Sequence, residues 1–387
     1  MRAVSEGRLS TSANAFERHI DRCLGCRACE AVCPAGVQYG ELLEASRAEL
    51  FNLQAKRGVI YNLLRFVLRH VWLQPKRLQF AFAVARSLRD SGVARVLLKS
   101  KIARVFSERF EFSLALLESS RPAFRDSFRG AGDRVPAKVT GRRALLFKAC
   151  VTDGLFARVN EASKRVLSVN GFSIVVPENQ VCCGALHAHA GDLEGARKLA
   201  RQNINAFGNE EASILTNAGG CGAMLISYKH LLAGDKVFEE LAHKFSALVR
   251  DVSQELTSAP LVKGAPVGNA RITYDASCHL LYGQGAAEEP LQLLNSIPEL
   301  NFVPLPGSEK CCGGAGVYNL VEREMSRDVL AQKLAAIKET RAEVVATGNA
   351  GCHMQIGAGA VLENQAVKVM HPIELLDESY RRAGMYK

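Results

Sequence analysis

The sequence predicts an α/β protein with a short cysteine-rich N-terminal piece, a helical connector and two repeated halves, each built on a parallel sheet. Three observations predict this fold class: a tight run of four cysteines near the N-terminus, a basic stretch with helical periodicity, and a pattern of cysteines and glycines that occurs twice in the rest of the chain. We place the domain boundaries at 1–55, 56–140, 141–262 and 263–387.

Composition indicates a folded protein of two or three domains. The chain has 387 residues, of which 48% are hydrophobic and 23% charged. Its 12 cysteines follow no apparent signal peptide, so we expect thiols in the cytoplasm that bind metal rather than form disulfides. The most apolar region, 59–73, is interrupted by Arg65, Arg69 and His70, and falls short of the ~20 apolar residues that a membrane-spanning helix needs.

The N-terminal run consists of Cys23, Cys26, Cys29 and Cys33, followed by Pro34. This is the bacterial ferredoxin spacing, in which three closely spaced thiolates bind three irons of one cubane and the fourth cysteine serves another cluster. The proline stops the turn from continuing as a helix. A zinc site is the alternative, but zinc sites use two separated pairs of ligands. We therefore predict a partial ferredoxin-type 4Fe-4S domain in which all four cysteines bind cofactor.

The sequence contains no second ferredoxin run, which would supply the fourth ligand to the cluster of Cys23, Cys26 and Cys29. The first 22 residues contain no cysteine, and the next cysteine after the run is Cys150. We expect Cys33 to face outward, and the cluster of this run to be held less completely than the others.

The connector reads as helical from about residue 50 to 138. Its apolar residues recur at helical spacing, as in Ile60, Leu63, Leu64, Val67, Leu68 and Val71. We expect further helices at 80–88 and 94–106, and a loop at 119–140, where glycine and proline gather.

Positive charge is concentrated around the connector: residues 65–143 hold 18 Lys and Arg against 6 Asp and Glu, a local charge of +12 against +10 for the whole chain. Such a segment suggests an anionic partner, either an acidic subunit or anionic lipid. Nucleic acid is not expected, because no recognition motif accompanies the charge. The plain alternative is that these cations line solvated helix faces.

The repeat is the most informative pattern in the chain. Each half has a single cysteine, then a Cys-Cys-Gly, then a Gly-Cys: Cys150, Cys182, Cys183 and Cys221 in the first half, and Cys278, Cys311, Cys312 and Cys352 in the second. Matching cysteines are 128, 129, 129 and 131 residues apart, which chance does not explain. Buried small hydrophobic residues could account for one pair but not for two in register.

Each cysteine group follows an apolar run rich in β-formers. The runs are 144–147, 172–176 and 213–216 in the first half, and 272–274, 300–303 and 343–346 in the second. Helical segments such as 191–207 and 321–338 lie between them, which predicts a parallel sheet in each half. Loops at the carboxyl ends of parallel strands meet at one edge, so we expect four thiolates to converge there in each half.

Together, the cysteine run and the repeat resemble a known protein family. Both halves are similar to the cysteine-rich CCG domain of heterodisulfide reductase, of lactate-utilisation iron–sulfur proteins, and of the iron–sulfur subunits of glycolate oxidase and anaerobic glycerol-3-phosphate dehydrogenase. With the ferredoxin run and the segment Val181–His189, the chain most resembles the glycolate oxidase iron–sulfur subunits. The resemblance implies one or more 4Fe-4S clusters that carry electrons from an FAD-containing partner, which oxidises a 2-hydroxy acid, to a quinone or similar acceptor. It also implies a cytoplasmic protein, with peripheral association at the inner face of the membrane as a further expectation.

Two departures from the family bear on function. The family carries two ferredoxin runs, and the first is expected to be missing here. Disulfide-reducing relatives add a C-x-x-C to each half, but the corresponding neighbours of Cys221 and Cys352 are Ala218, Met224, Asn349 and Gln355. This favours electron transfer, with no catalytic residue in the chain itself, over the alternatives: a heterodisulfide-reductase-like catalytic subunit, or a lactate or glycerol-3-phosphate dehydrogenase iron–sulfur subunit.

Two histidines follow the first Cys-Cys-Gly. His187 and His189 are candidates to move protons near an acceptor, and the alternative is that they are ordinary surface or helix-start histidines.

Overall fold

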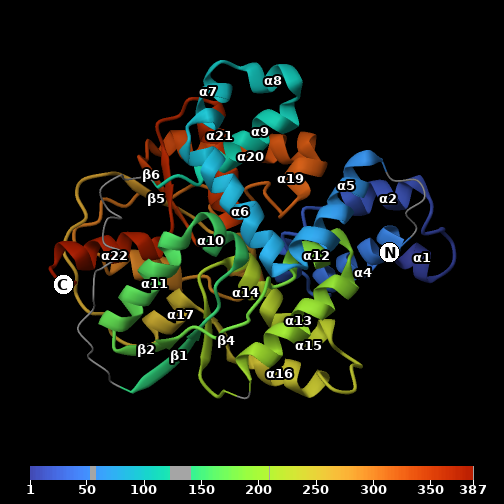
Figure 1. The fold of residues 1–387 in the computed structure, drawn as a ribbon, viewed down its shortest axis with the longest axis horizontal. Coiled ribbons are helices and arrows are strands. Elements are labelled where there is room, and N and C mark those ends of the chain that lie inside the picture. The colour runs from blue at the N-terminus through green and yellow to red at the C-terminus, as the bar shows by residue number, and fades with distance from the viewer. Residues whose placement is uncertain (53–57, 123–140, 209, 387) are drawn as a thin grey trace.

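The computed structural model describes residues 1–52, 58–122, 141–208 and 210–386 (Figure 1). In their described residues, the N-terminal piece and the connector consist of helices joined by loops. Their elements are α1 (Arg2–Ser5), α2 (Asn14–Asp21), α3 (Ala28–Ala31), α4 (Tyr39–Asn52), α5 (Val59–Val67), the π-helical turn η1 (Leu68–Trp72), α6 (Pro75–Asp90), α7 (Val93–Lys99), α8 (Ile102–Phe106) and α9 (Glu108–Ser119).

The helical prediction for the connector is confirmed, with one difference. The helix expected at 94–106 is two helices, α7 and α8, because the chain turns at Lys101, whose φ of 57° is left-handed. Most of the loop expected at 119–140 lies outside the described residues. None of the described helices is long and apolar enough to cross a membrane.

The first repeated half has a parallel four-stranded sheet with the order β2-β1-β3-β4. Its elements are β1 (Arg142–Leu146), α10 (Cys150–Leu155), α11 (Ala157–Val169), β2 (Phe172–Val175), α12 (Ala185–Ala190), α13 (Leu193–Phe207), β3 (Ser213–Thr216), α14 (Gly219–Ile226), α15 (Tyr228–Leu231), α16 (Glu239–Leu248), β4 (Val249–Asp251) and α17 (Val252–Thr257).

The second half has a parallel three-stranded sheet with the order β5-β6-β7. Its elements are β5 (Ile272–Asp275), the π-helical turn η2 (His279–Gly283), α18 (Glu289–Asn295), α19 (Tyr318–Val321), α20 (Arg323–Thr340), β6 (Val344–Thr347), α21 (Ala350–Leu362), β7 (Lys368–Met370) and α22 (Pro372–Arg382). The predicted α/β class with two parallel sheets is confirmed.

One predicted strand, 300–303, is wrong. The segment makes a single bridge, between Phe302 and Ile272. Pro304 follows at once and has no N–H to continue the ladder, while the carbonyl of Val303 accepts a hydrogen bond from the Thr273 hydroxyl (2.8 Å). The short strands β4 and β7 were not predicted from the sequence.

The two sheets share one hydrophobic core. Along β1, Ala144 and Leu146 point into a core that also contains Ile272 and Tyr274 of β5, whereas Leu145 points into a separate core under α13. This alternation follows from the period of two along a strand. The two halves pack against each other mainly through the helices that cover these sheet faces, α11 against α22 and α17 against α18.

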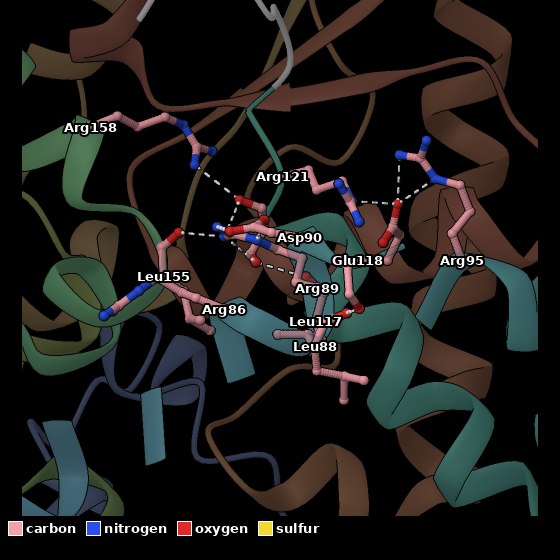
Figure 2. A network of polar contacts seen from close by, with 12 residues as sticks. Arg86, Leu88, Arg89, Asp90, Arg95, Leu117, Glu118, Arg121, Leu155 and Arg158 are labelled. Carbon is pink, nitrogen blue, oxygen red and sulfur yellow. Dashed lines mark hydrogen bonds and ion pairs between the residues drawn. The ribbon is translucent and has the colours of Figure 1, made fainter. Parts of the chain in front are cut away.

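Arginine contacts fasten the connector to the first half, as Figure 2 shows. Arg89, which is only 7% exposed, donates through Nη1 to the carbonyls of Ser120 (3.3 Å) and Leu155 (3.2 Å). Glu118 of α9 accepts from both Arg95 (2.7 Å) and Arg121 (2.8 Å). Part of the positive charge of the connector is thus used inside the protein rather than on solvated helix faces.

Candidate functional site

The four cysteines of the first half gather at the carboxyl edge of its sheet, as predicted. Cys150 follows β1 and begins α10, and Cys182 and Cys183 lie in the loop between β2 and α12. Cys221 lies in the first turn of α14, after β3. The Sγ atoms of Cys150 and Cys182 are 3.5 Å apart, and those of Cys183 and Cys221 are 3.2 Å apart. Both Sγ–Sγ distances are much longer than the ~2.05 Å of a disulfide bond, so these cysteines are free thiols in contact.

The second half repeats this arrangement. Cys278 follows β5, Cys312 lies in the loop before α19, and Cys352 lies in the first turn of α21 after β6. The neighbouring Cys311 thiol raises the pKa of Cys278, and the Cys311 and Cys352 thiols raise that of Cys312, so the four side chains lie close together. Each half therefore brings together the four cysteines that its sequence pattern singles out.

The loops of the two halves also touch each other. The amide N–H of Gly219 donates to the carbonyl of Gly348 (3.0 Å), and that of Gly220 donates to Oδ1 of Asn349 (3.2 Å). Gly219 and Gly220 lie just before Cys221, and Gly348 and Asn349 lie four and three residues before Cys352, so the two cysteine sets lie on either side of a shared contact.

The electrostatics of both sets favour a positively charged occupant. The pKa of Cys150 is raised well above its usual value by the neighbouring Cys182 thiol and by burial. Hydrogen bonds with Cys311 and Cys352, together with burial, do the same to Cys312. Thiols packed so closely resist losing their protons together, and a metal cation removes this penalty because it deprotonates the thiols that coordinate it.

The glycines beside the cysteines leave room for such a group. A Cβ on Gly314 would lie 3.4 Å from the Sγ of Cys312 and 3.5 Å from the carbonyl oxygen of Gly351. Gly313 has a φ of +84°, which favours glycine, and its amide N–H donates to the Sγ of Cys311 (3.4 Å). Soft sulfur donors from several loops, with backbone N–H groups near them, suit an iron–sulfur cluster. No group of three or more His, Cys, Asp or Glu side chains in the described ranges is arranged around a single metal ion.

The N-terminal run lies between α2 and α4. Gly25 has a φ of +66° and donates its amide N–H to the Sγ of Cys23 (3.4 Å). Cys29 is largely exposed, but partial desolvation of its thiol, together with the charge of Cys23, raises its pKa. Backbone N–H groups around residues 35–37 lower the pKa of Cys33, which is partly exposed.

The run packs against the second half, which the sequence did not predict. Tyr318 of α19 donates its hydroxyl to the carbonyl of Arg22 (3.0 Å), next to Cys23. Burial raises the pKa of Cys26, and the charge of Cys311 raises it further, which means that these two cysteines lie near each other. The cysteine sets thus form a connected series rather than three remote sites.

A cleft of about 200 Å³ opens where the N-terminal piece meets both halves. Two histidine–glutamate pairs line it: His189 with Glu44 (3.3 Å) and His230 with Glu41 (3.4 Å). A third histidine, His279, also lines the cleft, and its ring centroid is 5.2 Å from that of His189.

The histidines of this region differ in their surroundings. Burial, and then the nearby His189, lowers the pKa of His279 to about 4, so its ring is neutral at physiological pH. His187 does not face the cleft; it is fully buried, with Nδ1 2.9 Å from Oδ2 of Asp192. Sequence reasoning singled out His187 and His189, but it missed His230 and His279. The only signal for His279 was its position directly after Cys278.

Comparison with known proteins agrees with this geometry. Residues 144–226 and 272–357 each match the family model of the cysteine-rich CCG domain, so the fold and the cysteine sets define an iron–sulfur protein with a duplicated cysteine-rich domain.

Matches along nearly the whole chain place it more closely. It is 36% identical to the probable glycolate oxidase iron–sulfur subunit of Bacillus subtilis (strain 168), covering 98% of this chain and 86% of that protein. It is 30% identical to the glycolate oxidase iron–sulfur subunit of Escherichia coli (strain K12), covering 95% and 83%. The chain belongs to the family of glycolate oxidase iron–sulfur subunits. It is also 34% identical to lactate utilization protein A of Oceanobacillus iheyensis, over 62% of this chain and 98% of that protein.

Proposed function

We propose that this chain is the electron-transfer subunit of a flavin-dependent 2-hydroxy-acid oxidase, and that glycolate is the substrate of the complex. The observation that carries the proposal is the convergence of four cysteines at the same sheet edge in both halves, with a ferredoxin run packed against the second set. Relatives that match the chain almost from end to end carry the corresponding name.

We assign three cluster sites to these cysteines. Cys23, Cys26 and Cys29 would hold a 4Fe-4S cluster, with Cys33 turned toward a further ligand position. One site in each half would use the four cysteines of that half: Cys150, Cys182, Cys183 and Cys221, and Cys278, Cys311, Cys312 and Cys352. When bound, such clusters take up and release one electron at a time. The surrounding residues fix the thiolates, exclude water and supply the backbone N–H groups that tune the reduction potential.

The flavin chemistry belongs to a partner subunit. The chain has no dinucleotide-binding fingerprint, because Gly313, Gly314 and Gly316 follow cysteines rather than forming a phosphate-binding turn after a strand. An FAD-containing subunit would oxidise the hydroxy acid to the 2-oxo acid and pass two electrons, one after the other, to this chain.

We further propose a quinone as the acceptor and the histidine-lined cleft as the place where it is reduced. A quinone that gains two electrons also takes up two protons to become a quinol. The pairs His189–Glu44 and His230–Glu41 line this cleft together with His279, and imidazole and carboxyl groups can transfer protons to a bound quinone. A quinone dissolves in the bilayer, so this role implies that the protein associates peripherally with the membrane.

Anaerobic mixing of the purified chain with its flavoprotein partner tests this function. Adding glycolate should bleach the visible absorbance of the clusters, and adding a short-chain quinone should restore it. His189→Phe should slow only the second step, whereas Lys198→Gln, on the exposed surface of α13, should change neither. Clusters that stay oxidised with every 2-hydroxy acid, although the flavin is reduced, would contradict the proposal.

A further inference from the structure

A small helical hairpin projects from the top of the molecule in Figure 1 and has an unusual surface. It consists of α7 and α8, and residues 93–107 contain four cations and neither Asp nor Glu. Most of its larger apolar side chains face solvent rather than the protein: Val93 is 47% exposed, Val96 65%, Ile102 46%, Val105 85% and Phe106 77%.

Packing explains why these side chains point outward. The hairpin is attached to the rest of the connector through small residues, since Ala94 and Ala103 are fully buried against Leu114 of α9. An exposed set of large apolar side chains on a folded protein marks a surface that contacts something else.

Three of the four cations of the hairpin are unpaired among the described residues, whereas Figure 2 shows the fourth, Arg95, beside Glu118. Lys99, Lys101 and Arg104 make no ion pair or side-chain hydrogen bond with any other residue that the structure describes. Only Arg95 is paired, with Glu118. The nearest acid along the chain, Glu108, lies 3.8 Å from Arg327. Free positive charge therefore stands beside exposed apolar side chains.

We propose that this hairpin inserts its apolar side chains into the interface of an anionic membrane. Helical segments that combine Lys and Arg with exposed aliphatic and aromatic residues, and lack acidic residues, have the composition of interfacial membrane anchors. The proposal rests on the proposed function only for the purpose of the anchor. A membrane anchor would bring the protein to the bilayer in which the quinone dissolves.

Two other occupants fit this surface less well. A second copy docked by twofold symmetry would bring the same unpaired cations against each other. A redox partner must approach a cysteine set, but the hairpin lies over the far end of α21. The groove that Lys99, Lys101 and Arg104 line also contains three glutamates of α9 and residues 359–365, whereas Cys352 lies at the other end of α21. At 1.5 Å per residue, Cys352 and Leu362, the last residue of α21, are ~15 Å apart along the helix axis.

Vesicle co-sedimentation with the purified holoprotein tests the proposal. Vesicles of phosphatidylcholine with phosphatidylglycerol should bind the protein, binding should weaken as salt rises, and pure phosphatidylcholine should bind far less. Each cation near an anionic surface contributes about fivefold to partitioning, so the variant K99E/K101E/R104E should lose roughly 100-fold or more. The matched control K198E/K236E/K338E, with the same change in net charge at exposed sites elsewhere, should lose much less.

The apolar contribution is tested by V105D/F106D against the control V237D, since Val237 is also exposed (68%) but lies far along the chain from the hairpin. Iron content and reduction by the flavoprotein are measured on the same preparations, so that failure of the proposed function is distinguished from failure of the anchor. Equal vesicle binding by hairpin and control variants would overturn the proposal. It would also be overturned if the hairpin variants lost dimerisation or flavoprotein binding instead of vesicle binding.

Discussion

Gly313 gives a sharp test of how the second cysteine set is built. An alanine there would keep a φ of +84°, which costs an L-residue ~1–2 kcal/mol. Its Cβ would lie only 2.6 Å from the carbonyl oxygen of Ser326 on α20. Relieving that clash means moving either the loop that carries Cys311 and Cys312 or the helix behind it, and overpacking of this kind costs a further ~1–3 kcal/mol.

We therefore expect Gly313→Ala to reduce the free energy of unfolding by about 2–5 kcal/mol and to remove iron from the second set while the other sets keep theirs. Gly234→Ala is the matched control, because Gly234 has a φ of +78° but nothing within 4 Å of an added Cβ. It should cost only the ~1–2 kcal/mol of backbone strain and no iron. Iron and sulfide assays with thermal denaturation measure both effects. If the two variants were equally stable and held equal iron, the close packing of this loop would not matter to the cluster.

Three further predictions follow from the structure. Cys183→Ala should remove the cluster of the first half, and Cys312→Ala that of the second, as iron assay and electron paramagnetic resonance would show; full iron in both variants would make the pairs structural. Arg89→Met should cost about 1–3 kcal/mol of stability in urea denaturation, because the carbonyl of Leu155 loses this donor while that of Ser120 keeps Arg158, whereas loss of the exposed Arg77 should cost far less. Burial raises the pKa of Asp251 to about 6, so the folded chain holds a proton that the unfolded chain has lost between pH 4 and 6, and stability falls as pH rises through that window. Asp251→Asn, which can still cap α17, should remove up to ~3 kcal/mol of that fall, and an unchanged pH profile would refute the assignment.

The repeat made much of the fold predictable. Cysteines recurring at a nearly constant offset, each after an apolar run, implied two similar parallel sheets and a convergence of thiols at their carboxyl edges. That inference works because the carboxyl ends of parallel strands share one edge, whatever the details of packing. The strand expected at 300–303 failed because one proline, Pro304, ends its ladder, and the apolar run alone does not show how far pairing continues.

Contacts between distant segments were beyond the sequence. Nothing in the ferredoxin run indicates that it packs against the second half, since the contact depends on Tyr318 reaching the carbonyl of Arg22 across the fold. The basic connector shows the same limit. A count of charges cannot separate Arg89, which is buried and hydrogen-bonded, from Lys101, which is exposed and unpaired among the described residues. Only the structure shows which of these charges are free to meet a partner.

The central claim is that this chain carries several iron–sulfur clusters and no flavin. It is tested most directly by purifying the chain alone under strict anaerobiosis and measuring iron, acid-labile sulfide, zinc and flavin per protein. The account predicts a brown protein with iron and sulfide in near-equal amounts, a visible absorbance that bleaches on reduction, no flavin and no glycolate turnover without a partner. A colourless protein with stoichiometric zinc and no sulfide would contradict it.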